Sequence, residues 1–274
     1  MPVANAGRPA FATGIYVLGF NIGSALASAL AVPMADTAGS WRWSLIVFSA
    51  VTLVLVPAWI WLTREEAPHR RTGVEHVRLP FHSGTAWRLV GIFGSMACVF
   101  YGLNSWLPDA YVERGWSDGK AGALLAVLNI TALVTTVTVP WLSDRTGGRR
   151  VYLVGFGGAL VASAIGFAAV PGGAWLWAAV VGLGTGAMFP LVMTLPVDVG
   201  RRPADVVSVT GLMLGVGYII GAFAPLLLGA ARDVTGTYTA TLWLIAGAAS
   251  ILLSLCVSMT KERIARGVPA SEAA

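Results

Sequence analysis

The chain has 274 residues, of which 56% are hydrophobic and 11% are charged, and its formal net charge is +5. Soluble domains usually carry about 25% charged residues, so this composition excludes a cytosolic enzyme, a disordered chain and a disulfide-rich secreted domain. It indicates an all-α, polytopic membrane protein. No nucleic-acid partner is expected, because excess Lys and Arg in membrane proteins gather in cytoplasmic loops.

Eight charge-free segments are each long enough to cross about 30 Å of hydrocarbon as a helix. They predict eight transmembrane helices at about Ala10–Pro33, Trp43–Leu62, Leu89–Pro108, Ala121–Leu142, Val151–Val170, Ala174–Val197, Val206–Ala231 and Ala240–Met259. The fifth and sixth are separated by Pro-Gly-Gly at residues 171–173, which favours a turn over one continuous helix.

The connecting segments decide the orientation. Taken alternately, they place 14 of the 18 Lys and Arg residues on one side and four on the other. The positive-inside rule then predicts a multi-pass protein of the cell (inner) membrane with both termini in the cytoplasm.

A long polar stretch divides the chain into residues 1–63 with two helices, a linker at 64–88, a six-helix bundle at 89–260 and a cytoplasmic tail at 261–274. The linker is interpreted as solvated, or alternatively as a contact for lipid headgroups through Arg70, Arg71 and Arg78. All three histidines lie in it without metal-ligand spacing, and Cys98 and Cys256 fall in apolar spans. We therefore expect no metal site, no cofactor and no disulfide.

The six helices after the linker carry a faint internal repeat. The third span ends in Trp-Leu-Pro-Asp at 106–109, and the sixth ends in Thr-Leu-Pro-Val-Asp at 194–198. Two three-helix units of opposite orientation are typical of secondary transporters. Glycines four residues apart predict either static helix packing or surfaces on which helices slide, at Gly19/Gly23, Gly211/Gly215 and Gly217/Gly221.

The loop after the fourth span reads Asp-Arg-Thr-Gly-Gly-Arg-Arg at 144–150 and resembles the D-R-x-G-x-R-[RK] loop signature of the major facilitator superfamily. The glycines permit positive φ, and the acid can either pair with an arginine or lie near a helix N-terminus. From the residues alone, the loop also fits an ordinary positive-inside turn. The residues that match the signature are Asp144, Arg145, Gly147, Arg149 and Arg150.

A longer ordered series between Phe100 and Tyr238 is similar to the cyanate and nitroimidazole transporter branch of that superfamily; it includes Trp-Leu-Pro at 106–108, Glu-Arg-Gly at 113–115 and Arg-Asp-Val-Thr-Gly at 232–236. The resemblance implies transport, by alternating access, of a small solute such as cyanate, another small anion or a small drug-like molecule. It aligns the chain with the fifth to twelfth of twelve family helices only. On that basis we expect a major-facilitator-like bundle, deficient in transport by itself and prone to self-association.

No predicted span holds a central Asp, Glu, Lys, Arg or His. This argues against a proton relay and against a membrane-embedded enzyme with catalytic residues. Amide, phenol, hydroxyl and aromatic side chains remain as candidates for a substrate cavity, although each Asn also fits a helix–helix hydrogen bond. They are Asn21, Tyr101, Asn104, Asn129, Phe189, Thr194 and Tyr218. Two alternatives to transport stay open: a non-transporting remnant or scaffold and, less favoured, a membrane-embedded enzyme.

Overall fold

The computed structural model describes residues 37–63 and 79–260, together with the helical positions Gly19, Gly23, Leu30 and Met34. Within these residues seven helices are long and apolar enough to cross a membrane. The predicted first span lies almost wholly outside the described residues, so the expected number of eight helices is not confirmed. The predicted tail at 261–274 and most of the predicted linker lie outside them as well.

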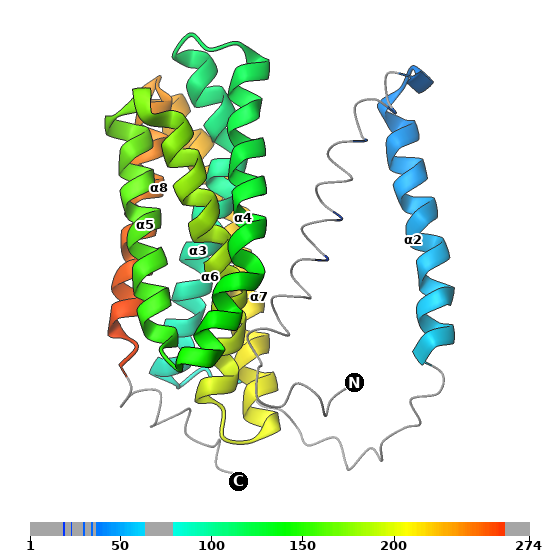
Figure 1. Ribbon diagram of the computed structural model, residues 1–274, viewed down its shortest axis with the longest axis vertical. Helices are drawn as coiled ribbons and strands as arrows, with labels where there is room; N and C mark the ends of the chain where they lie inside the picture. The colour runs from blue at the N-terminus through cyan, green and yellow to red at the C-terminus, as the bar shows by residue number, and fades with distance from the viewer. Residues whose placement is uncertain are drawn as a thin grey trace. The chain divides into compact units, whose positions relative to one another are not determined.

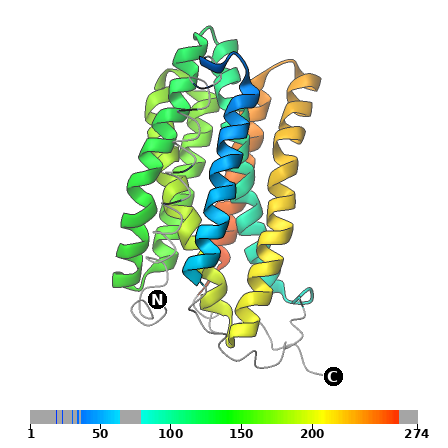
Figure 2. The same cartoon turned by 90° about the vertical axis from the view of Figure 1, so that its right-hand side faces the viewer.

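The described helices belong to two compact units, one formed by residues 18–76 and the other containing residues 77–274. In the first unit the long helix is α2. The second unit holds six long helices that run alongside one another as a bundle (Figures 1 and 2). The helices are α2 (Trp41–Thr63), α3 (Gly84–Glu113), α4 (Asp118–Thr146), α5 (Arg149–Ala169), α6 (Ala174–Val199), α7 (Pro203–Thr235) and α8 (Tyr238–Ser258), with a 3₁₀ turn at Pro171–Gly173.

Local capping chemistry sets several helix ends. The Ser83 hydroxyl accepts a hydrogen bond from the Ala86 N–H at 3.3 Å and starts α3. Pro203 fits the first position of α7, where no intrahelical N–H donor is needed. Gly147 and Gly236 end α4 and α7 with φ of 63° and 72°, in the left-handed region that favours glycine.

The helices are longer than the apolar spans that predict them. α3 begins at Gly84 rather than Leu89 and continues through Pro108 to Glu113, while α6 continues through Pro196 to Val199. A helix needs apolar side chains only where it meets hydrocarbon, and neighbouring helices make a proline tolerable inside a membrane helix. Pro108 therefore does not end its helix as the sequence suggested, and α6 runs two residues past its predicted end at Val197.

The packing of the bundle follows a two-fold repeat. α3 packs mainly against α7 and α8, α6 packs mainly against α4 and α5, and α5 and α8 pack against each other. Exchanging the unit α3–α5 with the unit α6–α8 reproduces this pattern of contacts. Because each unit has three helices, the second unit runs in the opposite sense, which agrees with the repeat expected from the sequence.

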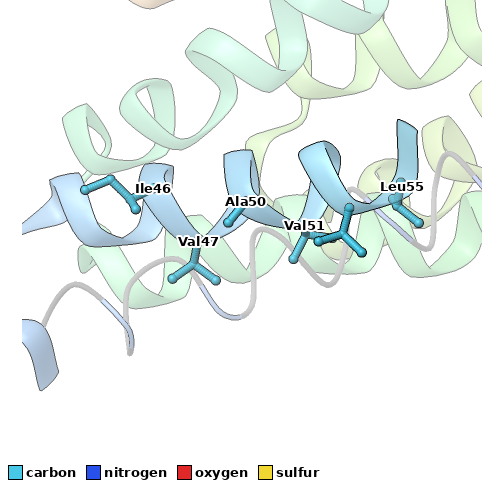
Figure 3. A pocket seen from close by; sticks show the side chains of 6 residues that line it. Ile46, Val47, Ala50, Val51 and Leu55 are labelled. Carbon is cyan, nitrogen blue, oxygen red and sulfur yellow. The ribbon is translucent and has the colours of Figure 1, made fainter. Parts of the chain in front are cut away.

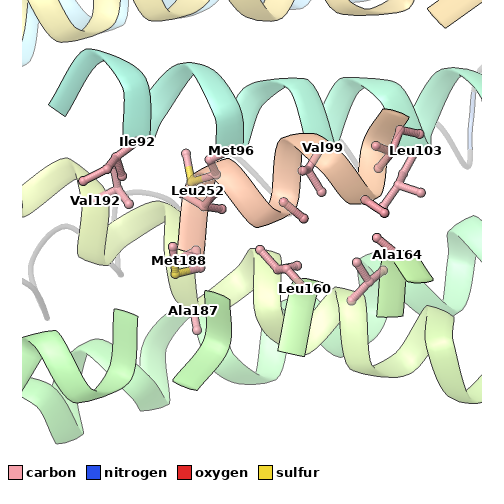
Figure 4. Packing of buried hydrophobic residues seen from close by; sticks show 14 of the residues in the cluster. Ile92, Met96, Val99, Leu103, Leu160, Ala164, Ala187, Met188, Val192 and Leu252 are labelled. Carbon is pink, nitrogen blue, oxygen red and sulfur yellow. The ribbon is translucent and has the colours of Figure 1, made fainter. Parts of the chain in front are cut away.

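α3 and α6 form the centre of the bundle. In their apolar windows 61% and 72% of the residues are buried, more than in any other described helix. Figure 4 shows side chains of α3, α5, α6 and α8 meeting in this core, among them Met96, Leu160, Met188 and Leu252. The bundle has a two-turn end, with turns at residues 147–148 and 200–202, and a three-turn end, with turns at 114–117, 170–173 and 236–237.

Glycines bring two helix pairs into close contact. A Cβ placed on Gly186 of α6 would lie 2.1 Å from the Ala132 carbonyl oxygen of α4, and one on Gly217 of α7 would lie 2.5 Å from the Phe93 ring of α3. Gly221, one turn further along α7, meets α3 in the same way. Only glycine allows these backbones to approach so closely, so the Gly217/Gly221 pair is a packing site.

The other predicted glycine pair of α7 has more room. A Cβ on Gly211 would meet only the end of the Leu79 side chain, at 3.7 Å, and a Cβ on Gly215 would meet no described atom within 4 Å. This pair is not a packing site within the described part of the chain. The sequence pattern is the same in both pairs, so the tertiary structure alone distinguishes them.

Candidate functional site

Three aromatic rings from three helices meet in the bundle and form what we call the aromatic cluster: Phe93 of α3, Phe189 of α6 and Tyr218 of α7. The Phe93 ring is fully buried; its centroid lies 4.9 Å from that of Tyr218, edge to face, and 6.2 Å from that of Phe189. Tyr218 remains 43% exposed. The cluster therefore joins two of the predicted substrate residues through a third that the sequence did not select.

Tyr101 lies on α3, eight residues after Phe93 of the cluster. Its ring carbons would be 3.2 Å from a Cβ on Gly221 of α7, so the absence of a side chain there seats the ring against the neighbouring helix. The side chain of Tyr101 is 36% exposed, and Phe100 supports its ring edge to face, with centroids 5.4 Å apart. Two tyrosine rings thus lie on the contact between α3 and α7 with part of each side chain uncovered.

Each of the two described asparagines donates a hydrogen bond from its side-chain amide to a backbone carbonyl of its own helix. Asn104 donates from Nδ2 to the Phe100 carbonyl of its own helix α3, and Asn129 donates to the Leu125 carbonyl of α4, both at 2.8 Å. Asn129 is exposed and Asn104 is half-buried. Neither bond crosses between helices, and each amide keeps a second N–H and a carbonyl oxygen with which it can bind a solute.

Of the remaining two candidates, one is buried and the other lies outside the described residues. Thr194 of α6 is buried, with 1% of the residue exposed, and its hydroxyl donates to the Leu191 carbonyl at 2.8 Å. It lies in the packed interior, and we do not retain it as a solute contact. Asn21 lies outside the described residues.

At the two-turn end the signature loop forms an ion-pair network that we call the clamp: Asp144, Arg149 and Asp198. The Arg149 guanidinium donates to Asp144 of α4 at 3.2 Å and, through its other terminal nitrogen, to both carboxylate oxygens of Asp198 of α6. The predicted pairing of the acid with an arginine is confirmed. The side chain of Asp144 is 3% exposed, so its charge is compensated inside the protein rather than by water.

The other basic residues of the signature have different partners. Arg145 lies over the Trp141 ring, 3.8 Å from its centroid. Arg150 donates to the Val257 carbonyl at 2.9 Å, in the last turn of α8, where a cation is favoured by the helix dipole. The loop therefore ties together the ends of α4, α5, α6 and α8.

Two residues that matter for the geometry escape sequence reasoning. Phe93 is one apolar residue among many in its span, and only the packing of α6 and α7 places it at the centre of the aromatic cluster. The Thr135 hydroxyl of α4 donates to the Leu183 carbonyl of α6 at 2.8 Å, between the close contacts made by Gly182 and Gly186. The spacing of these two glycines is the signal that could have located that contact.

A shallow hollow on α2 is less suited to a polar solute. Figure 3 shows the six side chains that line it, and all are aliphatic: Ile46, Val47, Ala50, Val51, Val54 and Leu55. Such a surface offers no hydrogen-bond donor to an anion or an amide. We therefore place the candidate site on the six-helix bundle.

Comparison with known proteins gives the family. The model of the Major Facilitator Superfamily matches residues 3–225. The chain is 26% identical over 258 residues to the 2-nitroimidazole transporter of Escherichia coli (strain K12), covering 91% of this chain and 65% of the relative. It is 29% identical over 239 residues to the cyanate transport protein of the same organism, covering 84% of this chain and 60% of the relative.

A third relative, a probable nitrate/nitrite transporter of Mycobacterium tuberculosis, is 28% identical over 278 residues, covering 94% of this chain and 66% of its own length. The chain thus spans about two thirds or less of the length of these relatives. All three names describe transporters rather than enzymes. Because the family model matches most of the chain, this membrane protein belongs to the Major Facilitator Superfamily.

Proposed function

We propose that the chain takes part in moving a small solute across the membrane by alternating access, with α3–α8 as one of the moving bundles. The family membership and the inverted pairing of the two three-helix units support this. The transporter names of the relatives favour it over a scaffold and over a membrane-embedded enzyme.

The observation that carries the proposal is the set of partly exposed polar and aromatic side chains on α3, α4 and α7, together with the aromatic cluster. They are Tyr101, Asn104, Asn129 and Tyr218. Phenol and amide groups can hydrogen-bond an anion or a neutral polar solute without a fixed positive charge. Aromatic edges add contacts to planar solutes. Small solutes with delocalised electrons, such as those named for the relatives, fit this chemistry.

The distribution of charge supports the orientation predicted from the sequence. In the bundle, the two-turn end carries Arg88, Arg145, Arg149, Arg150, Arg201 and Arg202, while the three-turn end carries Arg114, Lys120 and Arg232. We therefore assign the two-turn end to the cytoplasm of a cell (inner) membrane, with both termini on that side. α2 exposes apolar side chains along most of its length, and lipid or a second copy of the chain would cover them.

Purified protein in lipid nanodiscs should bind at least one of cyanate, nitrate or 2-nitroimidazole saturably, measured by isothermal titration or tryptophan fluorescence. Asn129→Leu should weaken that binding about tenfold, because one lost hydrogen bond to a charged or strongly polar ligand costs about 1.5 kcal/mol. Thr138→Val is the matched control. Thr138 is on the same helix, and its hydroxyl donates to the Val134 carbonyl of that helix at 2.6 Å.

Uptake of the same solutes into proteoliposomes, compared with empty vesicles, tests transport itself. Saturable uptake that is reduced by Asn129→Leu and kept by Thr138→Val would support the assignment of Asn129 and refute the expected deficiency in transport. Binding without uptake would agree with that deficiency. The absence of both binding and uptake for all three solutes would contradict the proposal. Equal loss of binding in both variants would remove Asn129 from the site.

A further inference from the structure

The three-turn end contains a set of contacts that the proposed solute site does not use. Glu113 is the last residue of α3, and its Oε1 accepts hydrogen bonds from the Thr237 hydroxyl and from the Tyr238 N–H, both at 3.2 Å. Thr237 is the N-cap of α8, and its hydroxyl also accepts from the Thr239 N–H at 3.2 Å. A carboxylate from α3 thus satisfies a free donor at the start of α8 and lies at the positive end of its dipole.

The turn that leads into α8 repeats the turn of the clamp. Residues 233–236 read Asp-Val-Thr-Gly and residues 144–147 read Asp-Arg-Thr-Gly. In both, the threonine hydroxyl donates to the carbonyl four residues back, at 2.7 Å for Thr235 and 3.0 Å for Thr146. In both, the glycine N–H does the same, at 2.8 Å and 3.0 Å, with positive φ.

The helices around the two turns also correspond. α5 starts at Arg149, two residues after the first glycine, and α8 starts at Tyr238, two residues after the second. Arg149 is held by Asp198 near the end of α6, while the Tyr238 N–H is held by Glu113 at the end of α3. Since α3 and α6 are equivalent in the repeat, Glu113 and Asp198 make corresponding contacts at the starts of α8 and α5, although the sequence repeat aligns Asp109, about one turn before Glu113, with Asp198.

We propose that Glu113 is the positioning residue of a latch, formed by Glu113, Thr237 and the Tyr238 N–H, that is the inverted-repeat counterpart of the clamp. The latch holds the end of α8 against the end of α3, so the bundle is fastened at both ends by related contacts. The consequence for transport, that the two ends move as one body, rests on the proposed function; the latch itself does not.

The latch is the weaker of the two fastenings. In the clamp a guanidinium lies between two carboxylates, whereas the latch joins one carboxylate to a hydroxyl and a backbone N–H. The nearby Arg232 forms an ion pair at 3.4 Å with Asp233, whose side chain is 76% exposed, so this pair adds little to the latch. The three-turn end should therefore loosen before the two-turn end.

Hydrogen exchange measured by mass spectrometry on the protein in nanodiscs tests the latch. Glu113→Ala should speed exchange in the first turn of α8 about fivefold, the effect of losing a typical capping acceptor. Glu113→Gln should retain most of the protection, because the amide oxygen accepts the same bonds. Asp118→Asn removes a carboxylate from the first turn of α4 at the same end and should leave α8 unchanged.

Two further variants keep the test decisive. If Glu113→Ala does not fold, Thr237→Val must speed exchange of the same amides, since it removes the hydroxyl that donates to Glu113. Asp198→Ala should speed exchange at the start of α5 and not of α8. Unchanged exchange in the first turn of α8, or equal acceleration by Asp118→Asn, would overturn the latch whether or not vesicles show uptake.

Discussion

Replacing Arg149 with alanine is expected to lower the free energy of unfolding of the six-helix bundle by about 3–5 kcal/mol, because a buried carboxylate loses the guanidinium with which it forms an ion pair. Arg149 has two such partners. The side chain of Asp198 is 27% exposed, so water compensates part of its charge. Most of the lost stability therefore comes from Asp144, whose side chain is 3% exposed. Unfolding in mixed detergent micelles, followed by circular dichroism, measures the change.

Three comparisons separate the loss of the clamp from a general loss of charge. Arg145→Ala removes the neighbouring arginine, which stacks on Trp141, and should cost only about 0.5–1 kcal/mol. Arg149→Lys should give an intermediate loss, because an ammonium group cannot bond two carboxylates with a planar fork. Asp198→Ala combined with Arg149→Ala should cost less than the sum of the single changes. Equal losses in Arg149→Ala and Arg145→Ala would contradict this account of the clamp.

Gly186→Ala should destabilise the bundle by about 3 kcal/mol, the upper part of the range for overpacking. The new Cβ would lie 2.1 Å from the Ala132 carbonyl oxygen and 2.6 Å from the Thr135 hydroxyl oxygen. A backbone carbonyl cannot move aside as a flexible side chain can, so α4 and α6 must separate. That separation also stretches the 2.8 Å bond between Thr135 and the Leu183 carbonyl.

The control for this change is Gly247→Ala on the exposed face of α8, where a Cβ would meet no described atom within 4 Å. Its melting temperature should equal that of the parent protein or exceed it slightly, because alanine favours a helix more than glycine does. A similar drop in melting temperature for both variants would show that α4 and α6 do not depend on the close contact at Gly186.

Much of the architecture follows from hydrophobicity and charge alone. A span of the membrane needs roughly 20 apolar residues, so the positions of α2 to α8 are predicted with errors mainly at their ends. Those errors have one cause: a helix needs apolar side chains only where it meets hydrocarbon, so α3 extends beyond its apolar span and through Pro108. Capping residues such as Ser83 mark the true ends better than the apolar boundary does.

The site was predicted less completely. The sequence selected Phe189 and Tyr218, which the structure joins through Phe93. It also selected Tyr101, whose ring lies against the Gly221 position of α7. Polar and aromatic groups of this kind stand out in an apolar span. The sequence could not select Phe93, whose role depends on which helices flank it, and it selected Thr194, which the packing buries in the interior. Residue type indicates what a side chain can bind, while exposure depends on every neighbouring helix.

By itself, the sequence determined the membrane-spanning character of the chain and the signature loop, and it offered the pairing of Asp144 with an arginine as one of two roles. These features depend on composition and on residues close together in the chain. The tertiary structure alone decided that Asp198 completes the clamp, that Gly217/Gly221 pack while Gly215 meets no described neighbour, and that Glu113 reaches α8. These outcomes join segments many residues apart. They depend on how α3–α5 and α6–α8 interlock, and identical glycine or carboxylate patterns on different helix faces carry no local signal of that arrangement.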